Sequence, residues 1–226
     1  MRKVKRMAGK WRWNSAQLAE RKWWQLYLKN KDVSAYLNWK VSYWKQLLAS
    51  CKDLVIKPDD RILDAGCGPA GVFMCFPNHD TVVAFDPLLE AYENDLPHFK
   101  KTMYPNVQFV QCGIEDFQWP GLFSKVFCMN AINHVRDIQL SFSRLCSMTS
   151  PGGQLIVTID AHNHGLFKHL FRMLPGDILH PHQFDLEEYK NMITQHGLKL
   201  IDVLHLKHEF FFDHYALIAE KPLFNS

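Results

Sequence analysis

The sequence predicts an α/β protein with a largely parallel sheet and helices on both faces. Two observations support this fold class. After residue 58, short apolar runs alternate with helical segments, which is typical of parallel strands joined by crossover helices. The first apolar run leads into the stretch Asp64–Gly71, D-A-G-C-G-P-A-G, whose glycines let the backbone approach a ligand where a side chain would obstruct it. A ligand site is therefore expected at the end of the first strand.

The composition is that of one globular domain with a modest appendage. The 226 residues are 47% hydrophobic and 22% charged, which suffices for a sizeable core. There is no run of about 18 or more apolar residues and no signal-peptide core, so we expect no transmembrane helix and a cytoplasmic protein. The six cysteines show no C-x-x-C spacing, which indicates a reduced protein without a disulfide scaffold or a zinc site.

Residues 1–57 form a basic, aromatic-rich segment that we expect to fold as a helical lid. Helices are predicted at about 15–29 and 33–51, and the first several residues are expected to be disordered. Residues 1–60 contain 14 Lys and Arg against 5 Asp and Glu, whereas the remainder contains 12 against 18. The basic segment could bind nucleic acid or anionic lipid, or it could pack on its own acidic domain. Its aromatic residues fit either packing between helices or an aromatic wall over an active site.

Residues 58–226 form the predicted α/β domain, with a cap-like insertion at about 162–184. The last two strands are separated by only a few residues, so they should form an antiparallel hairpin. The predicted strands are 61–64, 81–85, 107–111, 125–129, 154–160, 198–206 and 210–219, and the predicted helices are 70–75, 88–101, 137–148 and 185–196.

The aspartate two residues before the first glycine narrows the choice of ligand. A carboxylate at Asp64 would repel the pyrophosphate of a dinucleotide, but it would attract a ligand with an amino group and a sulfonium. S-adenosylmethionine (SAM) carries both groups and also a ribose diol. Asp86 ends the second strand 20 residues after Gly66, where its carboxylate can accept hydrogen bonds from both ribose hydroxyls. The two acidic residues together favour SAM.

The stretch Asp64–Gly71 resembles the first motif of class I SAM-dependent methyltransferases. Val82–Asp86 is similar to their second motif, and Asn133–Asp137 and Ser150–Gly153 resemble later segments of the subgroup that methylates small molecules. The resemblance covers about residues 58–220. It implies a Rossmann-like seven-stranded sheet of order 3-2-1-4-5-7-6 with strand 7 antiparallel. It also implies SAM as the methyl donor and S-adenosylhomocysteine as the product.

The resemblance assigns parts of the cofactor to residues of this chain. The region around Asp64 and Gly66 would hold the methionine part, Asp86 would bind the ribose, and Asn130 would lie near the methionine end. The complete predicted set is Asp64, Ala65, Gly66, Cys67, Gly68, Gly71, Asp86, Pro87, Leu88, Ile114, Glu115 and Asn130.

The adenine contact departs from the family pattern. Leu88 could flank the adenine, and Ile114 and Glu115 would meet it after the third strand. The family often has an aspartate just before this pair, positioned for the adenine amino group, whereas this chain has Gly113. The adenine would then be recognised by backbone atoms, by Glu115 or by Asp116 instead.

Five histidines are candidates for a base or for acceptor binding. Methyl transfer from a sulfonium is an in-line displacement, so alignment of the acceptor matters most, and proton removal matters for a hydroxyl, thiol or protonated amine. Two H-x-H pairs could suggest a metal, but no cysteine or acidic residue stands at compact ligand spacing, so no metal site is predicted. The five histidines, which the topology places on the ligand side of the sheet, are His134, His162, His164, His180 and His182.

The residues after the fourth strand narrow the acceptor class. Asn130–Asn133 reads N-A-I-N, without the Asn/Asp-Pro-Pro-aromatic motif of base-amino methyltransferases or the paired-glutamate loop of protein arginine methyltransferases. We therefore expect a small, partly apolar acceptor, methylated on oxygen or nitrogen, and nucleic acid is not the expected partner. The alternatives are a SAM- or NAD-binding protein without transferase activity, and a methyltransferase that acts on a macromolecule through its basic N-terminal segment. The sequence leaves the oligomeric state open.

Overall fold

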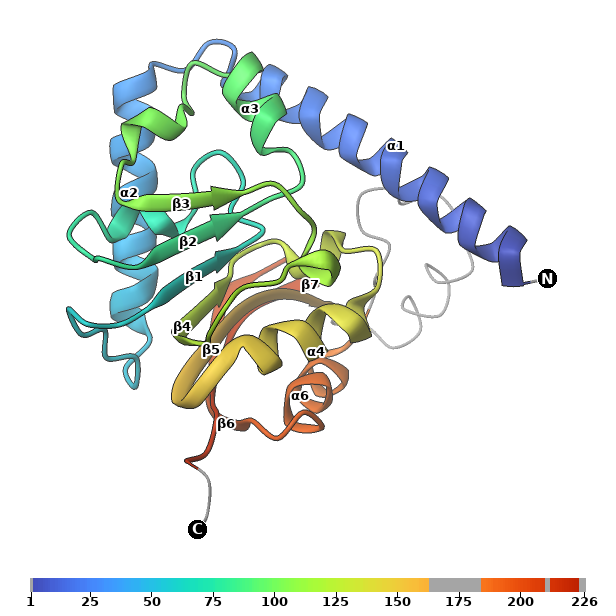
Figure 1. Cartoon of the computed structure of the whole chain (residues 1–226), viewed down its shortest axis with the longest axis vertical. Helices are drawn as coiled ribbons and strands as arrows, with labels where there is room; N and C mark the ends of the chain where they lie inside the picture. Colours follow the sequence, from blue (N-terminus) through green and yellow to red (C-terminus); the bar gives the residue numbers. More distant parts are fainter. Residues whose placement is uncertain (1, 163–183, 210–211, 224–226) are drawn as a thin grey trace.

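The computed structural model describes residues 2–162, 184–209 and 212–223 (Figure 1). Its centre is one seven-stranded sheet of order β3-β2-β1-β4-β5-β7-β6, in which β7 is antiparallel to β5 and to β6. The predicted fold and strand order are therefore confirmed. The strands are β1 (Ile62–Ala65), β2 (Val82–Phe85), β3 (Val107–Val110), β4 (Phe123–Cys128), β5 (Thr149–His162), β6 (Lys199–His208) and β7 (Phe212–Glu220).

The central strands end side by side at one edge of the sheet. Ala65 of β1 lies opposite Phe85 of β2, and Asp64 lies opposite Phe127 near the end of β4, with all three strands parallel. The loops that follow these strands therefore meet at a common carboxyl edge, which is where open α/β sheets bind their ligands.

Each face of the sheet is covered by helices and contributes to a separate buried core. Leu63 and Val126 share one core with Phe142 of α4 (Ile138–Met148), and α6 (Leu186–Thr194) packs on the same face. Ile62 and Phe127 share the other core with Trp44 of α2 (Val33–Ser50). The alternation of side chains along each strand thus explains why both faces are apolar.

The N-terminal segment forms two helices, α1 (Arg2–Leu28) and α2. The first several residues were predicted to be disordered, but in the structure α1 begins at Arg2. The helix can extend this far because the lysine, arginine and alanine residues of this stretch are good helix formers. Asp32 caps α2 by accepting the N–H of Ala35 at 2.8 Å. In Figure 1, α1 runs past α3 (Leu89–Asp95) and along the carboxyl edge of the sheet.

The helices on the α2 side are shorter than predicted. The segment after β1 is one 3₁₀ turn, η1 (Val72–Cys75), and the helix after β2 ends at Asp95, followed by η2 (Lys101–Met103). Pro97 explains why the second helix ends early, because a proline restricts the residue before it to extended conformations and ends a helix there. The first segment ends at Cys75 as predicted but begins two residues later than predicted, at Val72. Two further 3₁₀ turns are η3 (Ile114–Asp116) and η4 (Ile132–His134).

The cap-like insertion predicted at about 162–184 lies outside the described residues, apart from its two end positions. Within the described part of the chain, no helix is both long enough and apolar enough to cross a membrane.

Candidate active site

A cavity of about 460 Å³ lies at the carboxyl edge of the sheet. Its floor consists of the loops that follow β1 to β4, and its roof consists of side chains from α1 and α2. The predicted residues that line it are Gly66, Cys67, Gly68, Asp86, Pro87, Ile114, Glu115, Asn130 and His134. Four further predicted residues, Asp64, Ala65, Gly71 and Leu88, do not line it.

Backbone conformation requires the first two glycines of the loop, and close packing also requires Gly66. Gly66 and Gly68 have φ values of 68° and 57°, a region that favours glycine. A Cβ at Gly66 would lie 2.5 Å from Cβ of Ala131 in the loop after β4, and a Cβ at Gly68 would lie 3.8 Å from the ring of Trp24. The loop is thus pressed between a neighbouring loop and α1.

Asp64 lies behind this loop instead of facing the cavity. Its side chain is 1% exposed, and Oδ2 accepts the N–H of Phe73 in η1 at 2.9 Å. A Cβ at Gly71 would overlap this carboxylate, which explains why the third glycine is needed. Burial raises the pKa of Asp64 to about 7. In this structure Asp64 fixes the loop to η1 through Oδ2, and its direct contact with a cationic ligand stays a prediction.

Asp86 does enter the cavity. Its Oδ2 accepts the N–H of Gly68 at 3.0 Å and its Oδ1 accepts the N–H of Leu88 at 2.8 Å, so the carboxylate is held by the backbone on both sides. Burial raises its pKa to about 7, and the nearby carboxylate of Glu20 adds to the rise. Each oxygen of Asp86 keeps a further lone pair for a donor in the cavity.

Glu115 joins the loop after β3 to the loop after β4. Its Oε1 accepts the N–H groups of Arg136 and Asp137 at 2.7 and 2.8 Å, and the side chain is only 4% exposed. A Cβ at Gly113 would lie 3.1 Å from Oε2 of Glu115. The glycine that replaces the aspartate of the family therefore leaves the space that the Glu115 carboxylate uses.

The loop after β4 contributes Asn130 and His134. Asn130 has a φ of 55°, and it exchanges two hydrogen bonds with the Thr158 hydroxyl of β5, at 2.6 Å through its N–H and at 2.9 Å through its side-chain oxygen. A non-glycine residue in this region is uncommon and is often found at functional sites. His134 ends η4 and lines the cavity.

The structure describes only part of the predicted histidine group. The backbone of His162 forms the end of β5, opposite Phe212. The remaining candidates lie outside the described residues; they are His164, His180 and His182.

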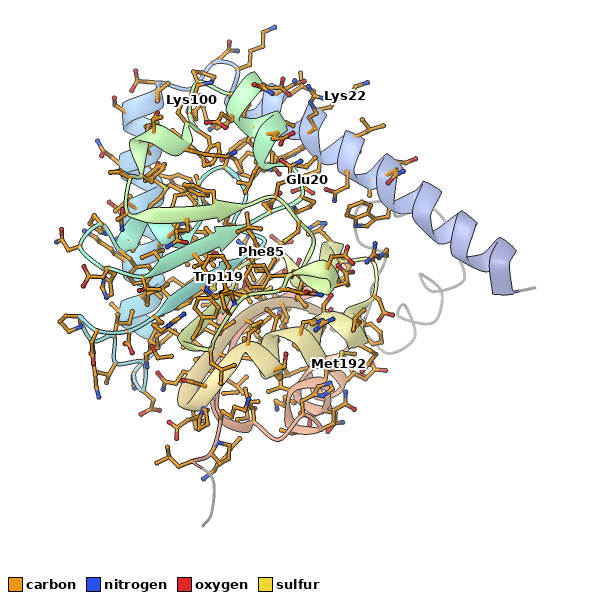
Figure 2. All side chains as sticks on the ribbon, in the orientation of Figure 1. Glu20, Lys22, Phe85, Lys100, Trp119 and Met192 are labelled. Atoms are coloured by element: carbon orange, nitrogen blue, oxygen red, sulfur yellow. The ribbon has the colours of Figure 1, made fainter. Side chains whose placement is uncertain are left out.

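One face of α1 forms a wall of the cavity, as in the interpretation of residues 1–57 as a lid with an aromatic wall, although the polar residues of this face were not assigned from the sequence. Trp13, Gln17, Glu20 and Trp24 are spaced by four, three and four residues, so they lie along one helical face, and all four line the cavity. Gln17 is only 9% exposed, and its Oε1 and the Nε1 of Trp24 are buried without a hydrogen-bond partner in the described structure. Buried polar atoms are normally paired, so these two atoms are available to a ligand. Figure 2 shows Glu20 on the side of α1 that faces the sheet and Lys22 on the opposite side.

Lys40 of α2 places a cation in the cavity. Its Nζ lies 4.4 Å from the ring centre of Trp44 and 5.0 Å from that of Tyr43, within the range of cation–π contacts. Burial lowers the pKa of Lys40 to about 8, and the opposite charge of Asp64 limits the decrease. The aromatic stripes of the N-terminal helices were visible in the sequence, but nothing there indicated that this lysine lies among them.

Contacts at two points hold α1 over the cavity. Arg21 binds Asp95 of α3 through two hydrogen bonds, from Nε at 2.5 Å and from Nη2 at 3.0 Å. Near the other end, the guanidinium of Arg136 lies 5.9 Å from the ring centre of Trp13. The helix therefore bridges α3 and the loop after β4.

The sheet order and the cavity at its carboxyl edge define the methyltransferase type of α/β fold. A family model described as a methyltransferase domain matches residues 56–197, which is well over half of the chain. The chain belongs to the class I SAM-dependent methyltransferase family, as its motifs predicted. A search of curated proteins finds no match.

Solved structures show the same fold at low sequence identity. A putative methyltransferase from Bacillus halodurans is 16% identical with a TM-score of 0.65, and the match covers 80% of this chain and 98% of that one. The N-methyltransferase NodS from Bradyrhizobium japonicum, in complex with S-adenosylhomocysteine, is 13% identical with a TM-score of 0.58, covering 87% and 91%. Phosphoethanolamine N-methyltransferase 2 from Haemonchus contortus, in complex with S-adenosyl-L-methionine, is 18% identical with a TM-score of 0.62, covering 79% and 53%.

Proposed function

We propose that this protein transfers a methyl group from SAM to a small, partly apolar acceptor. The observation that carries the proposal is the Asp86 carboxylate, which enters a cavity of about 460 Å³ directly beside the glycine loop. A cavity of this size is in the range of small-molecule sites. When bound, SAM would supply a methyl group on a sulfonium: the acceptor lone pair would form a bond to the methyl carbon while the carbon–sulfur bond breaks and neutral S-adenosylhomocysteine leaves.

The residues around the cavity suit the parts of SAM. The free lone pairs of Asp86 suit the two ribose hydroxyls, and Glu20 adds a second carboxylate on the same side. Ile114 offers an apolar surface for the adenine. The loop 66–68 would lie along the methionine part, where the ammonium of Lys40 can bind its carboxylate.

The acceptor would occupy the part of the cavity that is walled by Trp13, Met129 and Val135. These side chains exclude water from the acceptor, which keeps its lone pair free for attack. His134 also lines the cavity, and we assign to it the removal of a proton, from an acceptor hydroxyl as the new bond forms or from an acceptor ammonium before its lone pair attacks. Two of the similar structures are named N-methyltransferases, so amines are the first acceptors to test.

Calorimetry with SAM, S-adenosylhomocysteine and NAD tests the cofactor. We expect both SAM and its product to bind, and we expect Asp86→Ala to weaken SAM binding by about 1–3 kcal/mol because two ribose hydroxyls lose their acceptors. Asp59→Ala is the matched control, since Asp59 is exposed and does not line the cavity. Binding of NAD alone would overturn the proposal, and unchanged affinity in Asp86→Ala would reject the assigned ribose site.

A panel of acceptors with radiolabelled SAM tests the transfer. We expect label in small amines or hydroxyl compounds that carry an apolar group, and a lower rate in His134→Gln with SAM affinity unchanged. Label only in RNA or protein would reject the small acceptor and favour a role for the basic N-terminal segment. SAM binding without any labelled product would favour a binding protein that is not an enzyme.

A further inference from the structure

We propose that the β6–β7 hairpin carries a binding site for a divalent transition-metal ion, formed by His205, His208 and Asp213. One ligand atom from each of the three side chains lies within 4.8 Å of the other two. None of the three residues lines the cavity described above, so this site is separate from the proposed methyl-transfer site.

A bulge in β6 brings the two histidines to one face of the hairpin. Residues three apart on a regular strand point to opposite faces, because side chains alternate. Here His205 pairs with Tyr215 and Lys207 pairs with His214, so two steps along β6 match one step along β7. The extra residue reverses the alternation, and His208 then lies opposite Asp213 on the face that His205 shares.

Asp213 lies between the two imidazoles. Its Oδ1 is 2.6 Å from Nδ1 of His208 and 3.4 Å from Nε2 of His205. A single carboxylate oxygen that faces two ring nitrogens is an arrangement in which one cation can replace two hydrogen bonds. The Asp213 side chain is 18% exposed, whereas those of His205 and His208 are 49% and 71% exposed, so solvent can reach the site and supply further ligands.

Tyr215 supports the arrangement from the same face. Its hydroxyl donates to Oδ2 of Asp213 at 3.4 Å, and its ring lies 5.1 Å from the ring of His205. Such outer contacts orient metal ligands in established sites. The neighbouring charges do not oppose a cation, because Lys207 is paired with Glu209 and His214 is paired with Asp160.

The ligand set selects the class of ion. Two imidazole nitrogens and one carboxylate oxygen suit Zn²⁺, Co²⁺ or Ni²⁺, whereas Mg²⁺ and Ca²⁺ prefer oxygen ligands alone. Three protein ligands leave at least one position for water. An ion at this place would tie β6 to β7 at the end of the hairpin where β6, ending at His208, leads into β7, starting at Phe212.

Titration of the tag-free, chelator-treated full chain with Zn²⁺ tests the site by calorimetry. We expect a Zn²⁺ binding step that His208→Ala and Asp213→Asn each weaken by at least about tenfold. His79→Ala is the matched control, because His79 lies far from the hairpin and bonds to the Lys57 carbonyl, and it should leave the affinity unchanged. A melting temperature that Zn²⁺ raises in the wild type, but less in the two hairpin variants, should accompany this result.

The histidine-rich chain could bind Zn²⁺ elsewhere, and the variants distinguish that case. Equal affinity in wild type, His208→Ala and Asp213→Asn would overturn the proposal, as would the absence of any Zn²⁺ binding at micromolar concentrations. A site that prefers Mg²⁺ to Zn²⁺ would overturn the assigned class of ion. Circular dichroism checks that each variant is folded, and His205→Gln replaces any variant that is not.

Discussion

Lys40 is a half-buried ammonium that lies over the rings of Tyr43 and Trp44 and lines the cavity. Its pKa is lowered to about 8, so it is mostly charged at pH 7 but loses its proton within a range that binding experiments can cover. A charged lysine here would bind the carboxylate of the donor, and a neutral lysine would not.

We therefore predict that Lys40→Met weakens SAM binding by about tenfold at pH 7, because a charge-assisted hydrogen bond is lost. The affinity of the wild type should fall as the pH rises through about 8, and that of Lys40→Met should not follow this fall. Calorimetry between about pH 6.5 and about pH 9 measures both, with the exposed Lys45→Met as control. Equal pH profiles in wild type and Lys40→Met would show that Lys40 does not touch the donor.

The sequence predicted some residues of the site better than others. Asp86 was found because the carboxyl end of a predicted strand fixes its position, and the structure places it in the cavity. Asp64 was assigned to the ligand, but its neighbour Gly71 allows the carboxylate to turn behind the loop, which only packing reveals. Gln17 and Lys40 were missed, because their place depends on how two helices dock on distant parts of the chain.

At the scale of elements, the position of α1 decides the shape of the site. The helix supplies five residues of the cavity wall, and its docking depends on contacts such as that between Arg21 and Asp95, which are 74 residues apart in the chain. Asp95 also accepts from Gln25, and Arg21 holds the pKa of Asp95 below its usual value. Loss of this anchor should loosen the wall of the cavity.

We predict that Arg21→Ala increases hydrogen exchange of the α1 amides and weakens SAM binding, while exchange in the sheet stays unchanged. The effect on global stability should be small, because the ion pair is open to solvent. Lys22→Ala is a close control: Lys22 is the next residue and points away from the sheet (Figure 2). If α1 exchanges equally fast in wild type and Arg21→Ala, other contacts hold the helix.

The order of elements was more predictable than their details. Alternating strands and helices predicted the α/β class, and the family resemblance implied the sheet order, which the structure confirms. The length of the helix after β2 was overestimated, because Pro97 ends it early. The bulge in β6 leaves no clear signal in the sequence, because H-x-x-H on a regular strand predicts histidines on opposite faces. The possible ligand set on the hairpin was missed for this reason.

At the scale of the whole molecule, two buried carboxyl groups should make stability depend on pH. The pKa values of Asp64 and Asp86 are each raised from 3.8 to about 7, mainly by burial. A group whose pKa is higher in the folded state contributes stability that is fully present below pH 3.8 and is lost as the pH rises through about 7. Paired carboxylates such as Asp95 and Asp213 act in the opposite direction at low pH, since their pKa values are lowered.

We predict that Asp64→Asn removes part of the fall in stability that occurs as the pH rises. Relative to wild type, its free energy of unfolding should rise between pH 5 and pH 8 by an amount on the order of 2–4 kcal/mol, because the amide does not ionise and can still accept the N–H of Phe73. Urea unfolding at both pH values measures the difference, and the exposed Asp59→Asn serves as control. A difference between variant and wild type that does not change with pH would contradict the raised pKa.

The packing of the glycine loop has a consequence for which of its residues are kept during evolution. Ala131 leaves no room for a side chain at Gly66, and Asp64 leaves none at Gly71, so both glycines are demanded by the fold before any ligand binds. A descendant that had lost methyl transfer would still be selected to keep them, merely to remain folded. Conserved glycines in related proteins would thus indicate a shared fold and not a shared activity. Loss or retention of methyl-transfer activity should instead correlate with the residues at positions such as Gln17 and Lys40, whose side chains line the cavity.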